Sequence, residues 1–98
     1  MRPYTNTTNQ LRFDDAVIDK LWAHGLQPSQ VLAVLESRHV VKRNRSGRRA
    51  THLVIGRDAQ GRCLAIPVLP THDPMIWRPV TAWYCKPSEQ ALLPATDR

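Results

Sequence analysis

The sequence predicts a small α+β domain in which a helical hairpin packs on an antiparallel sheet of about four strands, followed by a short C-terminal helix. The first third carries two segments with apolar residues at helical spacing. From His39 onward, apolar residues alternate with period two, which is typical of strands. A chain of 98 residues suffices for one hydrophobic core and is too short for two. We therefore expect one domain over residues 11–93, with a flexible arm at 1–10 and a tail at 94–98.

Capping residues mark the two helices. Residues 10–13 alternate polar and apolar side chains and are expected to form a short edge strand. The first helix follows, because Asp14 or Asp15 can cap its start and Gly25 can end it in the left-handed conformation. Pro28 is allowed at a first helical position and opens the second helix. Apolar residues recur at helical spacing in both segments: Val17, Ile18, Leu21 and Trp22, then Val31, Leu32, Val34 and Leu35.

Four strands are expected in the remaining chain, at residues 39–44, 49–55, 63–69 and 76–84. Ser46-Gly47 and residues 58–61 read as hairpin turns, because glycine accepts the positive φ that such turns require. The first three strands should therefore form an antiparallel meander. Pro79 argues for an edge position, a bulge or an irregularity in the fourth strand, since proline cannot donate to a sheet ladder. A last short helix is expected to start at Pro87.

Several observations indicate a cytoplasmic protein that does not associate with membranes. The best candidate for a membrane segment, residues 64–69, is far shorter than the roughly 18 residues of a membrane helix. The first ten residues lack the apolar segment of a secretory signal. Cys63 and Cys85 are too few for a disulfide-rich secreted scaffold and form no CxxC pair. We therefore expect both cysteines to be reduced and buried, and leave open whether they approach each other.

The excess positive charge lies in residues 38–62. This segment has eight basic residues against Asp58 alone, a net charge of +7, whereas the whole chain carries +6, so the remainder carries −1. Seven of the eight are arginines, whose guanidinium groups make bidentate hydrogen bonds to phosphate. We expect RNA as partner, its backbone held by Arg43, Arg45, Arg48, Arg49, Arg57 and Arg62. The open alternatives are a solvated hairpin face and a docking surface for an acidic protein.

The chemistry expected at this surface uses no metal and no cofactor. The four histidines are scattered without HxxxH or HExxH spacing, and no glycine-rich phosphate motif is present. Metal-independent RNA cleavage remains, which needs an acid, a base and cations around the phosphorane. If Leu53 and Ile55 face the helices, His52 faces the open side, and burial of Trp77 and Trp83 turns Arg78 and Tyr84 to that side too. The opposite assignment stays open, because both parities of the fourth strand are apolar.

An ordered series of short segments runs from about Leu11 to Leu93. Its members are Phe13-Asp14-Asp15-Ala16, His24-Gly25-Leu26, Leu53-Val54-Ile55-Gly56-Arg57, Gly61-Arg62, Trp77-Arg78-Pro79-Val80-Thr81-Ala82 and Glu89. This series resembles the BrnT family of type II toxins. The resemblance implies a RelE-like fold, an endoribonuclease that inhibits translation, and a DNA-binding antitoxin partner. It matches Arg78 to a basic residue of the family's fourth strand, and Glu89 to the acidic residue of its last helix.

The chain departs from the family after the fourth strand. Where the family continues Ser-Ala-Arg, this chain has Thr81-Ala82-Trp83, and Leu93 stands where the family has a Tyr. Lys86 can stand in for a lost basic residue. We therefore expect a catalytic set drawn from Arg78, His52, Tyr84, Lys86 and Glu89, with the acid and base roles unassigned. The alternative is a non-catalytic nucleic-acid-binding or protein-interaction module that uses the basic hairpin 38–62.

Overall fold

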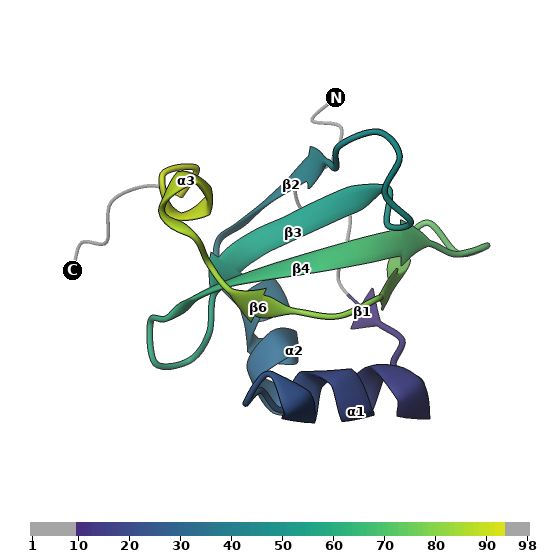
Figure 1. Cartoon of the computed structure of the whole chain (residues 1–98), viewed down its shortest axis with the longest axis horizontal. Coiled ribbons are helices and arrows are strands. Elements are labelled where there is room, and N and C mark those ends of the chain that lie inside the picture. The colour runs from purple at the N-terminus through teal and green to yellow at the C-terminus, as the bar shows by residue number, and fades with distance from the viewer. Residues whose placement is uncertain (1–9, 94–98) are drawn as a thin grey trace.

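A computed structural model describes residues 10–93 of the chain (Figure 1). Residues 1–9 of the arm expected at 1–10 lie outside the described residues, as does the tail expected at 94–98. Helices α1 (Asp15–Ala23) and α2 (Pro28–Glu36) cover one face of a mainly antiparallel sheet, and α3 (Pro87–Gln90) lies on the other side (Figure 1). The α+β prediction is confirmed. Within residues 10–93, no helix is both long and apolar enough to cross a membrane.

The two long helices begin where the capping residues predict. The Val17 backbone N–H donates to Asp14 Oδ1 at 2.9 Å, so Asp14 caps α1. Gly25 follows α1 with a φ of +74°, a conformation that few other residues adopt. Pro28 occupies the first turn of α2, where its missing N–H leaves no helical bond unmade.

The sheet has the order β1-β5-β4-β3-β2, with β6 also paired to β4. The antiparallel meander is confirmed and consists of β2 (His39–Arg43), β3 (His52–Arg57) and β4 (Cys63–Pro70). The short strand β1 (Gln10–Leu11) pairs in parallel with β5 (Ile76–Pro79), so the sheet is not purely antiparallel.

The predicted fourth strand is divided into β5 and β6 (Trp83–Tyr84). Both pair with the same edge of β4, β5 near its end and β6 near its start. The chain leaves the ladder directly after Pro79, which confirms the predicted irregularity. In the connecting segment, the Val80 N–H donates to the Pro67 carbonyl at 2.9 Å.

Hydrophobic clusters lie on both faces of the sheet. The helix-side cluster contains Val17, Leu21, Leu26, Val31, Val34, Val41, Val54, Leu64, Ile66, Val68, Trp77 and Ala82. The second cluster contains Leu53, Ile55, Cys63, Ala65 and Leu93, with Val40, Trp83 and Cys85 packed against it. The prediction that Leu53 and Ile55 face the helices is therefore wrong, as is the placement of Trp83 on the same side as Trp77. Because β3 is covered on both faces, its apolar residues run continuously and their alternation is uninformative.

A disulfide bond joins Cys63 to Cys85, so the expectation of reduced cysteines is wrong for this structure. The two residues are 22 positions apart in sequence, and their Cα atoms are 5.3 Å apart. Pairing of β6 with the start of β4 brings them together, and the Cys85 N–H donates to the Cys63 carbonyl at 2.9 Å. The bond fastens the segment that leads into α3 to the first residue of β4.

Candidate functional site

A groove of about 620 Å³ opens between the β2–β3 hairpin and the C-terminal segment 83–92. Leu53, Pro67 and Val80 contribute apolar lining. Six basic residues line it, and we call it the basic groove: Lys42, Arg43, Arg45, Arg48, Arg49 and Lys86. Among the described residues of this lining, Glu89 is the one that is acidic. The groove therefore combines an apolar base with strongly cationic walls.

The hairpin wall is held in shape by Asn44. Its backbone N–H donates to the Thr51 carbonyl at 2.9 Å, and its side-chain amide donates to the Ala50 carbonyl at 3.0 Å. The same side chain accepts the Arg45 N–H at 2.8 Å. Gly47 has a φ of +85° and lets the loop reverse direction. The loop is longer than predicted, because β2 ends at Arg43 and β3 begins only at His52, and its arginine side chains are exposed.

The opposite wall is organised around Glu89. Its carboxylate accepts the indole N–H of Trp83 at 3.1 and 3.3 Å, and the backbone N–H of Lys86 at 2.8 Å. The bond from the Lys86 backbone N–H caps α3. The Lys86 ammonium lies 5.8 Å from the centre of the Trp83 ring. Glu89 is thus engaged in holding Trp83 and Lys86 in place.

His52 lies outside the basic groove. Its ring centre is 4.9 Å from that of Trp77, a residue of the helix-side cluster, and Thr51 Oγ1 lies 2.8 Å from His52 Nδ1. Burial lowers the pKa of His52 below 6.5, and the positive charge of Arg43 lowers it further. The histidine is therefore neutral at pH 7.

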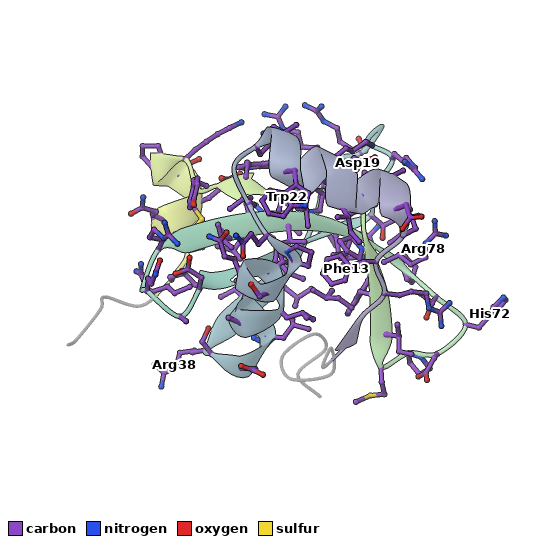
Figure 2. All side chains as sticks on the ribbon, turned by 90° about the horizontal axis from the view of Figure 1, so that it is seen from below. Phe13, Asp19, Trp22, Arg38, His72 and Arg78 are labelled. Atoms are coloured by element: carbon purple, nitrogen blue, oxygen red, sulfur yellow. A yellow bond between two sulfur atoms is a disulfide. The ribbon has the colours of Figure 1, made fainter. Side chains whose placement is uncertain are left out.

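Arg78 is also remote from the groove. Its Nη2 atom lies 4.0 Å from Asp14 Oδ2 in an exposed ion pair. Figure 2 shows Arg78 beside the start of α1, close to Phe13. The guanidinium of Arg78 therefore faces the cap of the first helix.

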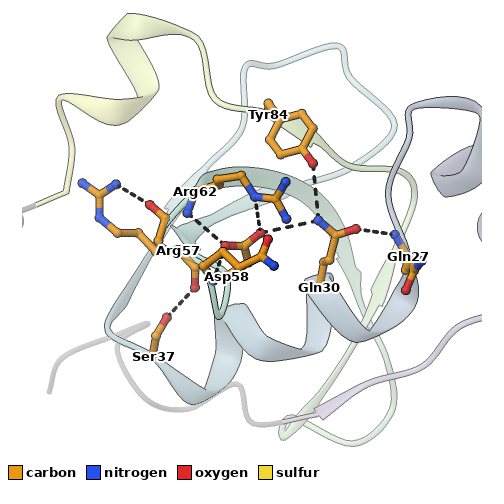
Figure 3. A network of polar contacts seen from close by, with 9 residues as sticks. Gln27, Gln30, Ser37, Arg57, Asp58, Arg62 and Tyr84 are labelled. Atoms are coloured by element: carbon orange, nitrogen blue, oxygen red, sulfur yellow. Dashed lines mark hydrogen bonds and ion pairs between the residues drawn. The ribbon is translucent and has the colours of Figure 1, made fainter.

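Tyr84, Arg57 and Arg62 belong to a polar network at the far end of β3 (Figure 3). The Gln30 amide donates to Tyr84 OH at 3.3 Å and to Asp58 Oδ2 at 3.4 Å. Arg62 Nε lies 3.1 Å from Asp58 Oδ2, and its guanidinium lies 5.5 Å from the Tyr84 ring centre. Arg57 donates to the Gly61 carbonyl at 3.2 Å. These contacts stabilise the β3–β4 turn against α2.

Asp58 is the buried anion of this network, with its side chain only 2% exposed. Burial raises the pKa of Asp58, but the backbone N–H groups of Arg62 and Gln60, the Gln30 amide and the Arg62 charge together lower it below 3.8. The carboxylate is therefore charged at neutral pH and offsets part of the positive charge in the turn. Among residues 10–93, Arg62 has an ion-pair partner, whereas no ion pair is found there for the groove arginines.

Comparisons with known proteins add no relative: no protein-family model matches the chain, and no curated protein matches its sequence. The BrnT resemblance accordingly remains an expectation. Within residues 10–93, no three His, Cys, Asp or Glu side chains are grouped as ligands of a metal ion.

The structure divides the predicted site residues into two sets. It brings Arg43, Arg45, Arg48, Arg49, Lys86 and Glu89 to the basic groove. It places Arg57 and Arg62 at the opposite end of β3, and His52, Arg78 and Tyr84 in contacts with the helix side. The predicted convergence of His52, Arg78 and Tyr84 on one open face is therefore wrong, because the parity of β3 is reversed and the chain leaves the sheet after Pro79. Sequence reasoning missed Trp83 as a groove residue, since its place opposite the arginines depends on that exit.

Proposed function

We propose that the basic groove binds the phosphate backbone of RNA. The observation that carries the proposal is the convergence of cations from two distant segments, residues 42–49 and Lys86, over one groove. A merely solvated surface mixes charges of both signs. The two ion pairs found among residues 10–93, Arg62 with Asp58 and Arg78 with Asp14, both lie outside the groove. Its arginines are thus available for bidentate phosphate contacts and for displacing counterions.

Salt-dependent RNA binding tests this proposal. We expect fluorescence anisotropy with a labelled single-stranded RNA to give an affinity that falls with salt. The triple variant Arg45→Ala/Arg48→Ala/Arg49→Ala removes three phosphate contacts and should reduce the slope of log K against log salt by about 2. The control Arg57→Ala/Arg78→Ala removes two arginines outside the groove and should leave the slope nearly unchanged. Equal losses in both variants would refute the assignment to the groove.

We further propose that the bound RNA is cleaved without a metal ion, as the BrnT resemblance implies for a type II toxin with a RelE-like fold. The supporting observation is that Lys86 shares the groove with the arginines. Its ammonium can stabilise charge on the phosphorane or protonate the leaving oxygen. Glu89 is the nearby carboxylate, although its oxygens already accept hydrogen bonds from Trp83 and Lys86. This proposal assigns the chemistry to Lys86 and Glu89 rather than to His52, Tyr84 or Arg78.

RNA cleavage in the presence of a chelator separates these assignments. We expect wild type to cleave RNA and Lys86→Ala to be impaired by at least about a hundredfold, the lower end for a general acid or base. His52→Ala and Arg78→Ala serve as controls that alter expected catalytic residues outside the groove. Loss of cleavage in these controls with full activity of Lys86→Ala would place the active site elsewhere. RNA binding without cleavage by wild type would leave the alternative, a non-catalytic nucleic-acid-binding module.

An antitoxin partner belongs to the same proposal. A neutralising protein has to cover the cationic walls, so its contact segment should be acidic and should compete with RNA. If an acidic protein binds the groove and RNA binding is lost at moderate salt, the chain is instead a protein-interaction module.

A further inference from the structure

Trp83 stands out in the basic groove because, among the described lining residues, it is the aromatic one beside six cationic side chains. The indole is half-buried and packs against the second hydrophobic cluster. Its ring also borders Lys86, whose ammonium lies 5.8 Å from the ring centre. A cationic groove with an aromatic ring in its wall is the arrangement with which proteins bind single-stranded nucleic acids.

The Trp83 indole and the backbone on either side of it are both held in place. The indole N–H donates to both carboxylate oxygens of Glu89. The backbone of Trp83 is opposite Ala65 in the β4–β6 ladder. Two residues later, Cys85 is bonded to Cys63 at the start of β4. A ring that is already immobilised loses little conformational entropy when another planar group stacks on it.

We propose that Trp83 is a stacking platform for one base of single-stranded RNA, so that the groove selects unpaired over duplex RNA. This inference rests on the proposed binding of RNA in the groove. The base takes the place of the Lys86 ammonium beside the ring, and the exposed Lys86 side chain turns to the neighbouring phosphate. In a duplex both faces of each base are already stacked, so only the phosphate contacts remain. Trp83 is thus a specificity-determining residue, distinct from the groups proposed for cleavage.

The test compares two substitutions at this position with three ligands. Trp83→Leu removes the aromatic face, whereas Trp83→Phe keeps an aromatic face and removes the N–H donated to Glu89. The first ligand is a labelled single-stranded RNA of about twelve nucleotides, a length within the site sizes of single-strand binders. The other two are the same strand annealed into a duplex and inorganic polyphosphate. We expect Trp83→Leu to weaken single-strand binding by about tenfold, with duplex and polyphosphate binding unchanged. Trp83→Phe should retain most of the single-strand affinity.

The outcomes separate stacking from a structural role. If Trp83→Phe loses as much affinity as Trp83→Leu, or if polyphosphate binding falls in parallel, the residue only maintains the shape of the groove and the proposal is overturned. If Trp83→Leu binds single strands as tightly as wild type does, the stacking proposal is overturned as well, while the proposal that the groove binds RNA stands. A wild-type chain that binds none of the three ligands overturns the groove proposal itself.

A measurement with Trp83 intact covers the case in which Trp83→Leu does not fold. The background Trp22→Phe/Trp77→Phe leaves Trp83 as the sole tryptophan. Trp22 is exposed, and Trp77→Phe breaks no hydrogen bond among the described residues, because the buried Trp77 N–H has no partner there. Stacking predicts quenching of the remaining emission by single-stranded RNA and none by polyphosphate at equal saturation. Emission that responds equally to both ligands contradicts the proposal.

Discussion

Removal of the disulfide between Cys63 and Cys85 should destabilise the chain substantially. The bond closes a loop across 22 positions, and a loop of this length restricts the unfolded chain by about 11 cal/mol/K, which gives about 3.4 kcal/mol at 25 °C. Domains of this size have unfolding free energies of roughly 5–15 kcal/mol. The disulfide therefore accounts for a large fraction of the stability. The attached helix α3 has only four residues and cannot persist without its attachment.

Urea unfolding followed by circular dichroism measures this effect. We expect a dithiol reductant to lower the unfolding free energy of wild type by about 3 kcal/mol. The double variant Cys63→Ala/Cys85→Ala has no bond to reduce, so its transition should be the same with and without reductant. Alanine is preferred to serine at these positions because Cys63 is buried and a serine hydroxyl there would need a partner.

An unchanged urea midpoint of wild type on reduction would refute the reasoning. A titration of free thiols in denatured, air-oxidised protein then identifies the faulty step. Two free thiols per chain would mean that the bond does not form in solution. No free thiols would mean that the bond forms and that the loop-entropy estimate fails, for example because the reduced chain retains structure around the β4–β6 pairing.

Three further predictions concern the fold. Gly56→Ala places a Cβ atom 2.7 Å from Val34 Cγ1, so we expect a loss of about 1–3 kcal/mol in urea unfolding. Because the pKa of Asp58 is lowered, its stabilisation is complete above pH 3.8 and is lost as the pH falls below that value; Asp58→Asn should flatten the dependence of Tm on pH in this range. The lowered pKa of His52 affects stability in the same direction, because on acidification the unfolded chain binds a proton at His52 before the folded chain does. Stability should therefore fall as the pH drops below 6.5, and His52→Gln should reduce that fall in the same Tm measurement.

The helices and the meander were predictable because local chemistry specifies them. Asp14 and Pro28 begin the helices and Gly25 ends the first one, whatever packs against them. Which residues of β3 point to which face of the sheet was not predictable in the same way. Leu53 and Ile55 are as apolar as Val54, and the choice between the two faces depends on what covers each of them.

About half of the candidate site could be predicted for a similar reason. The arginines near the β2–β3 turn are adjacent in sequence, so any hairpin gathers them. Whether Lys86, Tyr84 or Arg78 joins them depends on where the chain leaves β5 and where it returns to β4. The Cys63–Cys85 bond depends on that same return. Such long-range registers are set by tertiary packing and leave little trace in local sequence.

The second hydrophobic cluster and the basic groove adjoin each other, since Leu53 belongs to both and Trp83 lines the groove and packs against the cluster. A ligand in the groove thus rests directly on part of the core and can bind only the folded chain. By mass action, saturation at 100 times Kd would add about 2.7 kcal/mol to the unfolding free energy. Thermal shift is therefore a direct way to screen for the natural ligand of this chain, with no assumption about its chemistry.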